Sequence, residues 1–180
     1  MGLCARLARM SLRNVRSFDQ DRPGKGKAKV ITLELERVIR RPVQAVWDFF
    51  SDFEAMPSWQ PEFRELVQQT PGPVGVGTVF RYRRKVPFGE QQGTMEITEW
   101  DPPRRLGFSA EPGPVLPRGS WTFTSDDATT RVVDHLDAEL QGLLRVFSPI
   151  LRRQFAQEGS RHLDEAVRRL EAAAAAPKDT

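Results

Sequence analysis

The sequence predicts an α+β protein in which an antiparallel sheet is followed by one long C-terminal helix. Two patterns predict this class. Between residues 30 and 140, short stretches of alternating apolar and polar residues are separated by turn segments rich in Gly, Pro and Asp, which is typical of consecutive antiparallel strands. From about residue 143 the apolar residues recur instead at helical spacing. The 180 residues are enough for one domain with a substantial core.

The first strand is followed by two short helices. Residues 30–39 are predicted as a strand, because Ile31, Leu33 and Leu35 alternate with Thr32, Glu34 and Glu36. Pro42 suits the first turn of a helix, because no backbone donor is needed there, and we expect this helix to end at Phe50. Ser51 or Asp52 can then cap a second short helix by accepting hydrogen bonds from its free N–H groups.

The remaining strands are separated by short turns, so each is expected to pair with the next in an antiparallel meander. The segments 87–90 and 111–119 contain Gly and Pro and are expected to be loops. The last helix should run from about Leu143 to Ala176. Pro149 should kink it or separate its first turn, because proline lacks a backbone donor. The strands are predicted at residues 63–69, 78–86, 93–100, 106–110, 120–124 and 131–140.

Three motifs are similar to those of a known family. They are Pro42…Val46-Trp47…Asp52…Trp59…Pro61, then Gly75-Val76-Gly77-Thr78-Val79-Phe80, then Ile97-Thr98-Glu99-Trp100-Asp101-Pro102-Pro103-Arg104-Arg105-Leu106. In this order, and followed by a long helix, they resemble the polyketide cyclase/dehydrase family of the START/Bet v 1-like (SRPBCC) superfamily over roughly residues 30–172. The resemblance implies a helix-grip fold, in which a curved antiparallel sheet wraps around the long C-terminal helix, with two short helices after the first strand.

Charge is distributed unevenly along the chain. Residues 1–29 contain eight Lys/Arg and two Asp/Glu, which leaves 19 basic and 22 acidic residues in 30–180. We therefore interpret 1–29 as a basic N-terminal arm and linker, 30–172 as the START/Bet v 1-like domain and 173–180 as a tail. The negative balance of the domain argues against a nucleic-acid-binding face. Any attraction to a polyanion should come from the arm.

The arm allows more than one interpretation. Drawn as a helix, residues 1–18 place apolar side chains on one side and four arginines on the other. This is typical of a segment that lies on an anionic membrane surface, and also of an organelle transit peptide. A disordered arm, or translation that begins at Met10, explains the pattern more simply. If the arm is functional, the protein would be a membrane-surface or partner-binding module.

Several classes of protein and site are disfavoured. No apolar stretch is long enough to span a bilayer, no secretory signal is visible, and the single cysteine, Cys4, cannot form an intramolecular disulfide. These features favour a cytoplasmic protein. The two histidines, His135 and His162, lie far apart without a ligand-spacing motif, so we expect no metal site. The sequence has no phosphate loop, dinucleotide fingerprint or nucleophile elbow, and we expect no cofactor.

The resemblance implies a protein that binds a hydrophobic small molecule, such as a lipid, quinone or polyketide, in an apolar cavity between the sheet and the last helix. We expect the loops 87–90 and 111–119 to gate this cavity. Aromatic residues are also common as ordinary core, and core is the simpler interpretation of Trp47. The candidate cavity walls are Trp59, Phe80, Tyr82, Phe108, Trp121, Phe123, Phe147, Leu151 and Phe155.

The alternative is an enzyme of the cyclase/dehydratase kind, for which Tyr82, Arg84 and Asp134 are the candidate catalytic residues. Asp134 shares a strand face with apolar residues. A carboxyl group buried there needs a basic partner or takes up a proton, and could then act as a general acid or base. A structural ion pair, or a bulge that turns Asp134 outward, is the simpler explanation. Tyr82 and Arg84 are in phase with Phe80, and the resemblance makes Arg84 an analogue of the interior arginine that can stabilise an enolate or carboxylate in cyclase relatives.

The two histidines have different expected surroundings. His135 should face away from Asp134 and into solvent, whereas His162 lies near the edge of the apolar stripe of the last helix. His162 could shuttle a proton at the mouth of the cavity, but a partly buried, hydrogen-bonded histidine is the simpler expectation. The sequence predicts no particular oligomeric state.

Overall fold

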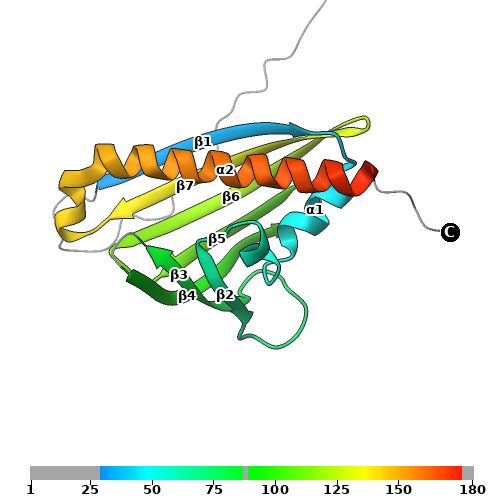
Figure 1. Cartoon of the computed structure of the whole chain (residues 1–180). Coiled ribbons are helices and arrows are strands. Elements are labelled where there is room, and N and C mark those ends of the chain that lie inside the picture. Colours follow the sequence, from blue (N-terminus) through cyan, green and yellow to red (C-terminus); the bar gives the residue numbers. More distant parts are fainter. Residues whose placement is uncertain (1–28, 87–88, 176–180) are drawn as a thin grey trace, which may run out of the picture.

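The computed structural model describes residues 29–86 and 89–175. Seven antiparallel strands form one sheet in the order β1-β7-β6-β5-β4-β3-β2, and a long helix lies across its concave side (Figure 1). This is the predicted helix-grip arrangement. The predicted arm, apart from Lys29, lies outside the described residues, as do residues 176–180 of the predicted tail.

The elements in chain order are β1 (Lys29–Ile39), α1 (Val43–Ser51), η1 (Met56–Ser58), β2 (Phe63–Gln68), β3 (Val79–Val86), β4 (Gly89–Asp101), β5 (Arg105–Glu111), β6 (Val115–Asp126), β7 (Thr129–Leu140), η2 (Gly142–Phe147) and α2 (Ser148–Ala175).

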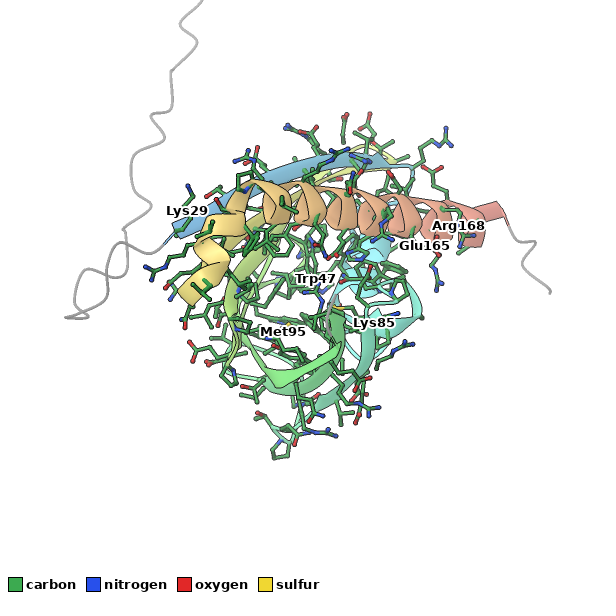
Figure 2. All side chains as sticks on the ribbon, turned by 60° about the vertical axis from the view of Figure 1, so that its left-hand side comes forward. Lys29, Trp47, Lys85, Met95, Glu165 and Arg168 are labelled. Atoms are coloured by element: carbon green, nitrogen blue, oxygen red, sulfur yellow. The ribbon has the colours of Figure 1, made fainter. Side chains whose placement is uncertain are left out.

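β1 and β7 pair along the whole length of β1, from Lys29 opposite Leu140 to Ile39 opposite Thr130. This pairing places the first and last strands of the chain side by side, and the other strands curve away below α2. The sheet therefore forms a trough, and Figure 2 shows side chains filling the space between the trough and the helix. Because side chains alternate along a strand, every second residue of each strand enters this space.

β6 is longer than the sequence predicts. It begins at Val115, so the prediction of a loop over 111–119 is wrong for most of that segment. The physical reason is long-range pairing, because β7 is twelve residues long and Val115 pairs with its last residue, Leu140. Pro117 is tolerated in the strand because it lies beyond Arg118, where pairing with β5 ends, so it has a strand neighbour on one side only.

The predicted gating loops are correspondingly short. β4 begins at Gly89, which pairs with Val86, so residues 89 and 90 of the segment predicted as the loop 87–90 belong to a strand. Residues 87 and 88 lie outside the described residues. Between β5 and β6 only residues 112–114 lack strand structure. A gate formed by a long loop over 111–119 is therefore excluded by the pairing of β6.

The C-terminal helical region is divided near Pro149, as predicted. The 3-10 helix η2 ends at Phe147, and α2 begins at Ser148. Pro149 thus stands in the first turn of α2, where its missing N–H would have had no intrahelical partner. From there α2 continues to Ala175, one residue before the predicted end.

Apolar side chains between the sheet and α2 form two clusters. The larger cluster lies where α1 approaches the C-terminal part of α2 (Figure 1), and we call this end the packed half. Trp47 of α1 is buried in it, as predicted, and so is Phe50. The second cluster lies under η2 and the beginning of α2, and we call that end the open half. It contains the buried residues Ile31, Leu33, Ala138 and Leu140 and the half-buried residues Val115, Leu136, Leu144, Leu151, Phe155 and Ala156.

Candidate functional site

Tyr82 and Arg84 lie on the same side of β3 as the buried Phe80, facing the trough, as their phase in the sequence predicts. The Tyr82 hydroxyl accepts a hydrogen bond from the Gln91 side-chain amide at 3.2 Å. Burial raises the pKa of Tyr82, and the nearby charge of Arg84 opposes this rise. Tyr82 is therefore a protonated phenol that can donate a hydrogen bond toward the space below α2.

Arg84 links the sheet to α2. One terminal guanidinium nitrogen donates to Glu158 Oε2 at 2.9 Å, and the side chains are 28% and 14% exposed. The guanidinium also lies 5.6 Å from the centroid of the Phe63 ring, a cation–π distance. Glu158 Oε1 accepts a second hydrogen bond, from Gln154, at 2.9 Å. Arg84 is thus a positive group at the edge of the trough whose position is set by the helix.

We expect the ion pair between Arg84 and Glu158 to stabilise the closed grip measurably. Replacing Arg84 by Gln or Glu158 by Gln should each cost about 1–2 kcal/mol, between the values for exposed and buried pairs. A double-mutant cycle on urea unfolding should show a coupling energy of about 1 kcal/mol.

The exposed pair Arg104–Asp101, with side chains 73% and 49% exposed, is the matched control. Its coupling energy should be below about 0.5 kcal/mol. A coupling energy for Arg84 and Glu158 as small as that of the control pair would show that the ion pair does not hold the helix on the sheet.

A second polar contact joins α2 to the start of β2. His162 Nε2 lies 2.7 Å from Glu62 Oε2, and Arg161 donates to Glu62 Oε1 at 3.0 Å. Burial lowers the pKa of His162 although Glu62 opposes this. Burial alone would raise the pKa of Glu62, but the hydrogen bond from His162 and the two neighbouring positive groups hold it below its usual value. The expectation of a partly buried, hydrogen-bonded His162 is confirmed.

Asp134 lies on β7 between Leu35 of β1 and Trp121 of β6, and its carboxylate faces α2 at Gly159. A Cβ atom at Gly159 would be 3.9 Å from Asp134 Oδ2. Among the described residues no basic side chain forms a salt bridge with it. Burial raises the pKa of Asp134 to about 7, although the charge of His135 and a hydrogen bond from Trp121 lower it. Asp134 can therefore exchange a proton near neutral pH.

A single stretch of α2 gathers these groups. Glu158 contacts Arg84 of β3, Gly159 faces Asp134, and Ser160 accepts a hydrogen bond from Arg37 of β1 at 2.7 Å. β4, β5 and β6 separate β3 from β7 in the sheet. The candidate catalytic residues therefore lie at the same level of the trough but on opposite flanks of the helix. A substrate would have to bridge them, because the side chains do not form one hydrogen-bonded triad.

The predicted cavity walls fall into two groups. Four of them are buried in the packed half among α1 side chains: Trp59, Phe80, Trp121 and Phe123. Tyr82 lies at the edge of this group. Leu151 and Phe155 of the open half, and Phe108, which packs on the larger cluster, are only half-buried although they face the trough. Phe147 is 52% exposed at the outer end of η2. The simpler interpretation as core thus describes the first group, while the second borders space that water reaches.

Two glycines that the sequence analysis did not single out shape the trough. A Cβ atom at Gly93 of β4 would be 2.8 Å from the Tyr82 hydroxyl, and one at Gly119 of β6 would overlap the Phe108 ring. Both aromatic rings therefore lie directly on the neighbouring strands. An isolated glycine within a strand pattern is the signal that predicts such a close approach.

Two depressions on the surface of the described residues lie outside the space between α2 and the sheet. One of about 370 Å³ is bounded by residues 154–161 of α2 alone, so it is a groove along one helix and not an enclosed cavity. The other, of about 150 Å³, lies beside Leu116, Asp137 and Glu139, which alternate with trough-facing residues. It is therefore on the convex face. A ligand entering the trough would have to displace side chains of the open half.

Over residues 29–86 and 89–175, no three His, Cys, Asp or Glu side chains come together as a metal ion would need. No helix in this part of the chain combines the length and apolarity needed to cross a membrane.

Comparison with solved structures shows a shared fold. TTHA0849 from Thermus thermophilus is 23% identical with a TM-score of 0.68, over 79% of this chain and 98% of that one. Zhui aromatase/cyclase from Streptomyces sp. R1128 is 16% identical with a TM-score of 0.69, over 79% and 94%. The di-domain ARO/CYC StfQ from the steffimycin biosynthetic pathway is 16% identical with a TM-score of 0.68, over 82% of this chain and 52% of that one.

The chain is also similar to a protein family at the level of sequence. The family model described as polyketide cyclase / dehydrase and lipid transport matches residues 30–175. No curated protein matches the chain significantly. Because the family match spans the sheet and the long helix that grips it, the chain belongs to the polyketide cyclase / dehydrase and lipid transport family of the SRPBCC superfamily.

Proposed function

We propose that the protein binds a hydrophobic small molecule, such as a lipid, quinone or polyketide, in the open half between α2 and the sheet. One observation carries this proposal. Leu151 and Phe155 of α2 pack on the second cluster and yet keep part of their surface exposed, and Phe108, which packs on the larger cluster, is also only half-buried. Phe80, Trp121 and Phe123 of the packed half are buried. Apolar groups that line a concave space and stay exposed to water gain free energy when a ligand covers them.

The polar groups at the rim of the open half favour a ligand with a polar end. Tyr82 and Gln91 form a hydrogen-bonded pair, Arg84 carries a positive charge, and Asp134 is a carboxyl that is neutral or charged near pH 7. A few polar groups at fixed places in an apolar site orient a ligand. We therefore expect a mainly apolar molecule with a carbonyl, hydroxyl or carboxyl group, which the protein would carry or sequester.

The experiment that tests this proposal is native mass spectrometry of the protein purified from its own host, followed by organic extraction and identification of bound molecules. A co-purifying lipid, quinone or polyketide would support the proposal. A protein that is empty and that also takes up no hydrophobic fluorescent probe would contradict it.

A large side chain in the open half should block binding. Replacing Leu151 by Trp adds a ring next to Phe155, and we expect the affinity for a hydrophobic fluorescent probe to fall at least about tenfold, which corresponds to 1.4 kcal/mol. Fluorescence titration measures this change. Replacing Val38 by Trp is the control, because Val38 is 55% exposed on the outer side of β1. Equal losses in both variants would place the probe outside the trough.

Catalysis of the cyclase or dehydratase type is the second candidate, and the raised pKa of Asp134 favours it. We propose that the Asp134 carboxylate removes a proton from carbon next to a substrate carbonyl, while Arg84 and Tyr82 stabilise the enolate oxygen. The titration of Asp134 near pH 7 suits proton transfer in both directions. If this is correct, replacing Asp134 by Asn should abolish turnover of an extracted ligand and leave its binding intact. Equal turnover in the variant would show that Asp134 is not the base, and no turnover by the unmodified protein would leave binding as the only function.

A further inference from the structure

Four large apolar side chains are exposed together at the outer end of the open half. Leu143, Val146, Phe147 and Ile150 are 84%, 77%, 52% and 67% exposed. They come from η2 and the first turn of α2, within eight consecutive residues. We call these four residues the η2 patch.

The segment that carries the η2 patch has apolar side chains on two opposite sides. Its opposite side presents Leu144, Leu151 and Phe155, which pack on the second core cluster. Monomeric proteins rarely leave clustered apolar side chains in water. The inner side of the segment is covered by the sheet, so the outer side is the face that lacks a partner.

The charge around the η2 patch indicates what this partner is. Residues 141–157 contain Arg145, Arg152 and Arg153 and no Asp or Glu. Arg152 and Arg153 are exposed, and neither forms a salt bridge among the described residues. The next acidic residue, Glu158, is already paired with Arg84. The partner must therefore combine an apolar interior with an anionic surface.

Two other occupants are disfavoured by the same charge. The N-terminal arm joins the domain at this end, because Lys29 pairs with Leu140 directly before η2 and lies beside the beginning of α2 (Figure 2). Residues 1–28 contain seven Lys/Arg and two Asp/Glu, so the basic arm would be repelled by the three arginines around the η2 patch. A second copy, patch against patch, would bring like charges together in the same way. An anionic surface attracts both the basic arm and the three arginines around the η2 patch.

We infer that the η2 patch docks the protein on an anionic lipid bilayer. The four apolar side chains enter the boundary between headgroups and acyl chains, and Arg145, Arg152 and Arg153 contact lipid phosphates. This geometry places the open half of the trough against the membrane. Docking does not require a bound ligand, so the inference is independent of the proposed ligand-binding function.

The test is co-sedimentation of the full-length protein with vesicles of phosphatidylcholine alone and of phosphatidylcholine mixed with phosphatidylglycerol. We expect binding to the anionic vesicles only. The double variant Val146→Glu/Ile150→Glu should bind at least about tenfold more weakly, and Arg152→Gln/Arg153→Gln roughly fivefold more weakly for each arginine removed. Val76→Glu is the matched control, since Val76 is 67% exposed in a loop before β3. It should bind as the unmodified protein does, and thermal unfolding should show that all variants are folded.

Several results would overturn the inference. One is the absence of binding to anionic vesicles by the unmodified protein. Another is unchanged binding in the Val146→Glu/Ile150→Glu variant combined with a loss when Arg6, Arg9, Arg13 and Arg16 are replaced by Gln, which would assign binding to the arm. A dimer in light scattering that dissociates in the Val146→Glu/Ile150→Glu variant would assign the η2 patch to a second copy of the chain.

Discussion

The unmodified protein is expected to lose stability as the pH rises from about 4 to about 7, and replacing Asp134 by Asn is expected to remove this loss. Burial raises the pKa of Asp134 from 3.8 to about 7 in the folded protein. At a pH between these two pKa values, Asp134 has lost its proton in the unfolded chain but keeps it in the folded protein. The free energy of unfolding therefore falls by about 1.4 kcal/mol for each unit by which the pH rises. The whole rise in the pKa of Asp134 corresponds to about 4 kcal/mol of unfolding free energy. Because Asp134 keeps some contact with water, we expect a loss of about 2–4 kcal/mol.

The measurement is urea unfolding of both proteins in steps from about pH 4 to pH 8. Other groups titrate in this range, since the pKa values of Glu62 and His162 are lowered and their contribution is lost as the pH falls. Both groups are present in both proteins, so the difference between the two curves isolates Asp134. Asn keeps an acceptor for the hydrogen bond from Trp121 but cannot ionise.

Asp137→Asn is the control for this experiment. Asp137 lies on the outer side of β7, 43% exposed, and accepts a hydrogen bond from Thr32 at 2.6 Å. Its replacement should leave the slope between pH 4 and pH 7 unchanged. If the Asp134→Asn curve runs parallel to that of the unmodified protein throughout, then Asp134 ionises as an ordinary exposed carboxyl, and the proton-transfer candidate loses its support.

The local patterns of the sequence predicted the elements whose stability comes from one buried face. β1 alternates from Ile31 to Glu36, and α1 and α2 carry apolar residues at helical spacing. The observed ends of these elements lie within one residue of prediction or, for the start of α2, at the predicted break near Pro149. β6 was predicted too short because Pro114, Pro117 and Gly119 are turn signals when taken locally. Pairing with the whole of β7 overrides these signals, and such pairing depends on residues far away in the sequence.

The candidate site shows the same division. Period-two alternation predicted that Tyr82, Arg84 and Asp134 face the trough, because orientation on a strand is a local property. The partner of Arg84 could not be predicted in this way, since Glu158 lies 74 residues further along the chain. Whether Glu158 faces Arg84 depends on the orientation in which α2 packs on the sheet. The filling of the trough could not be predicted either, because the volume left between helix and sheet depends on how all side chains pack.

Replacing Phe50 by Ala is expected to destabilise the protein by about 3–5 kcal/mol, as large-to-small changes in packed cores do. Phe50 has no exposed surface, and its ring centroid lies 5.3–5.4 Å from those of Trp59, Trp121 and Phe123. These three residues come from the end of η1 and from β6, so the cavity would open between rigid elements that collapse poorly. Urea unfolding measures the loss.

Phe147→Ala, which truncates a side chain that is 52% exposed in η2, should change stability by less than about 1 kcal/mol and serves as the control. The comparison also separates the two halves of the trough. If the ligand binds in the open half, the Phe50→Ala protein, studied below its unfolding transition, should keep its affinity for the fluorescent probe, because no open-half side chain has changed. A loss of affinity in Phe50→Ala as large as that in Leu151→Trp would instead place the ligand against the aromatic cluster. The packed half would then have to open to admit it, and stability and binding would depend on the same contacts.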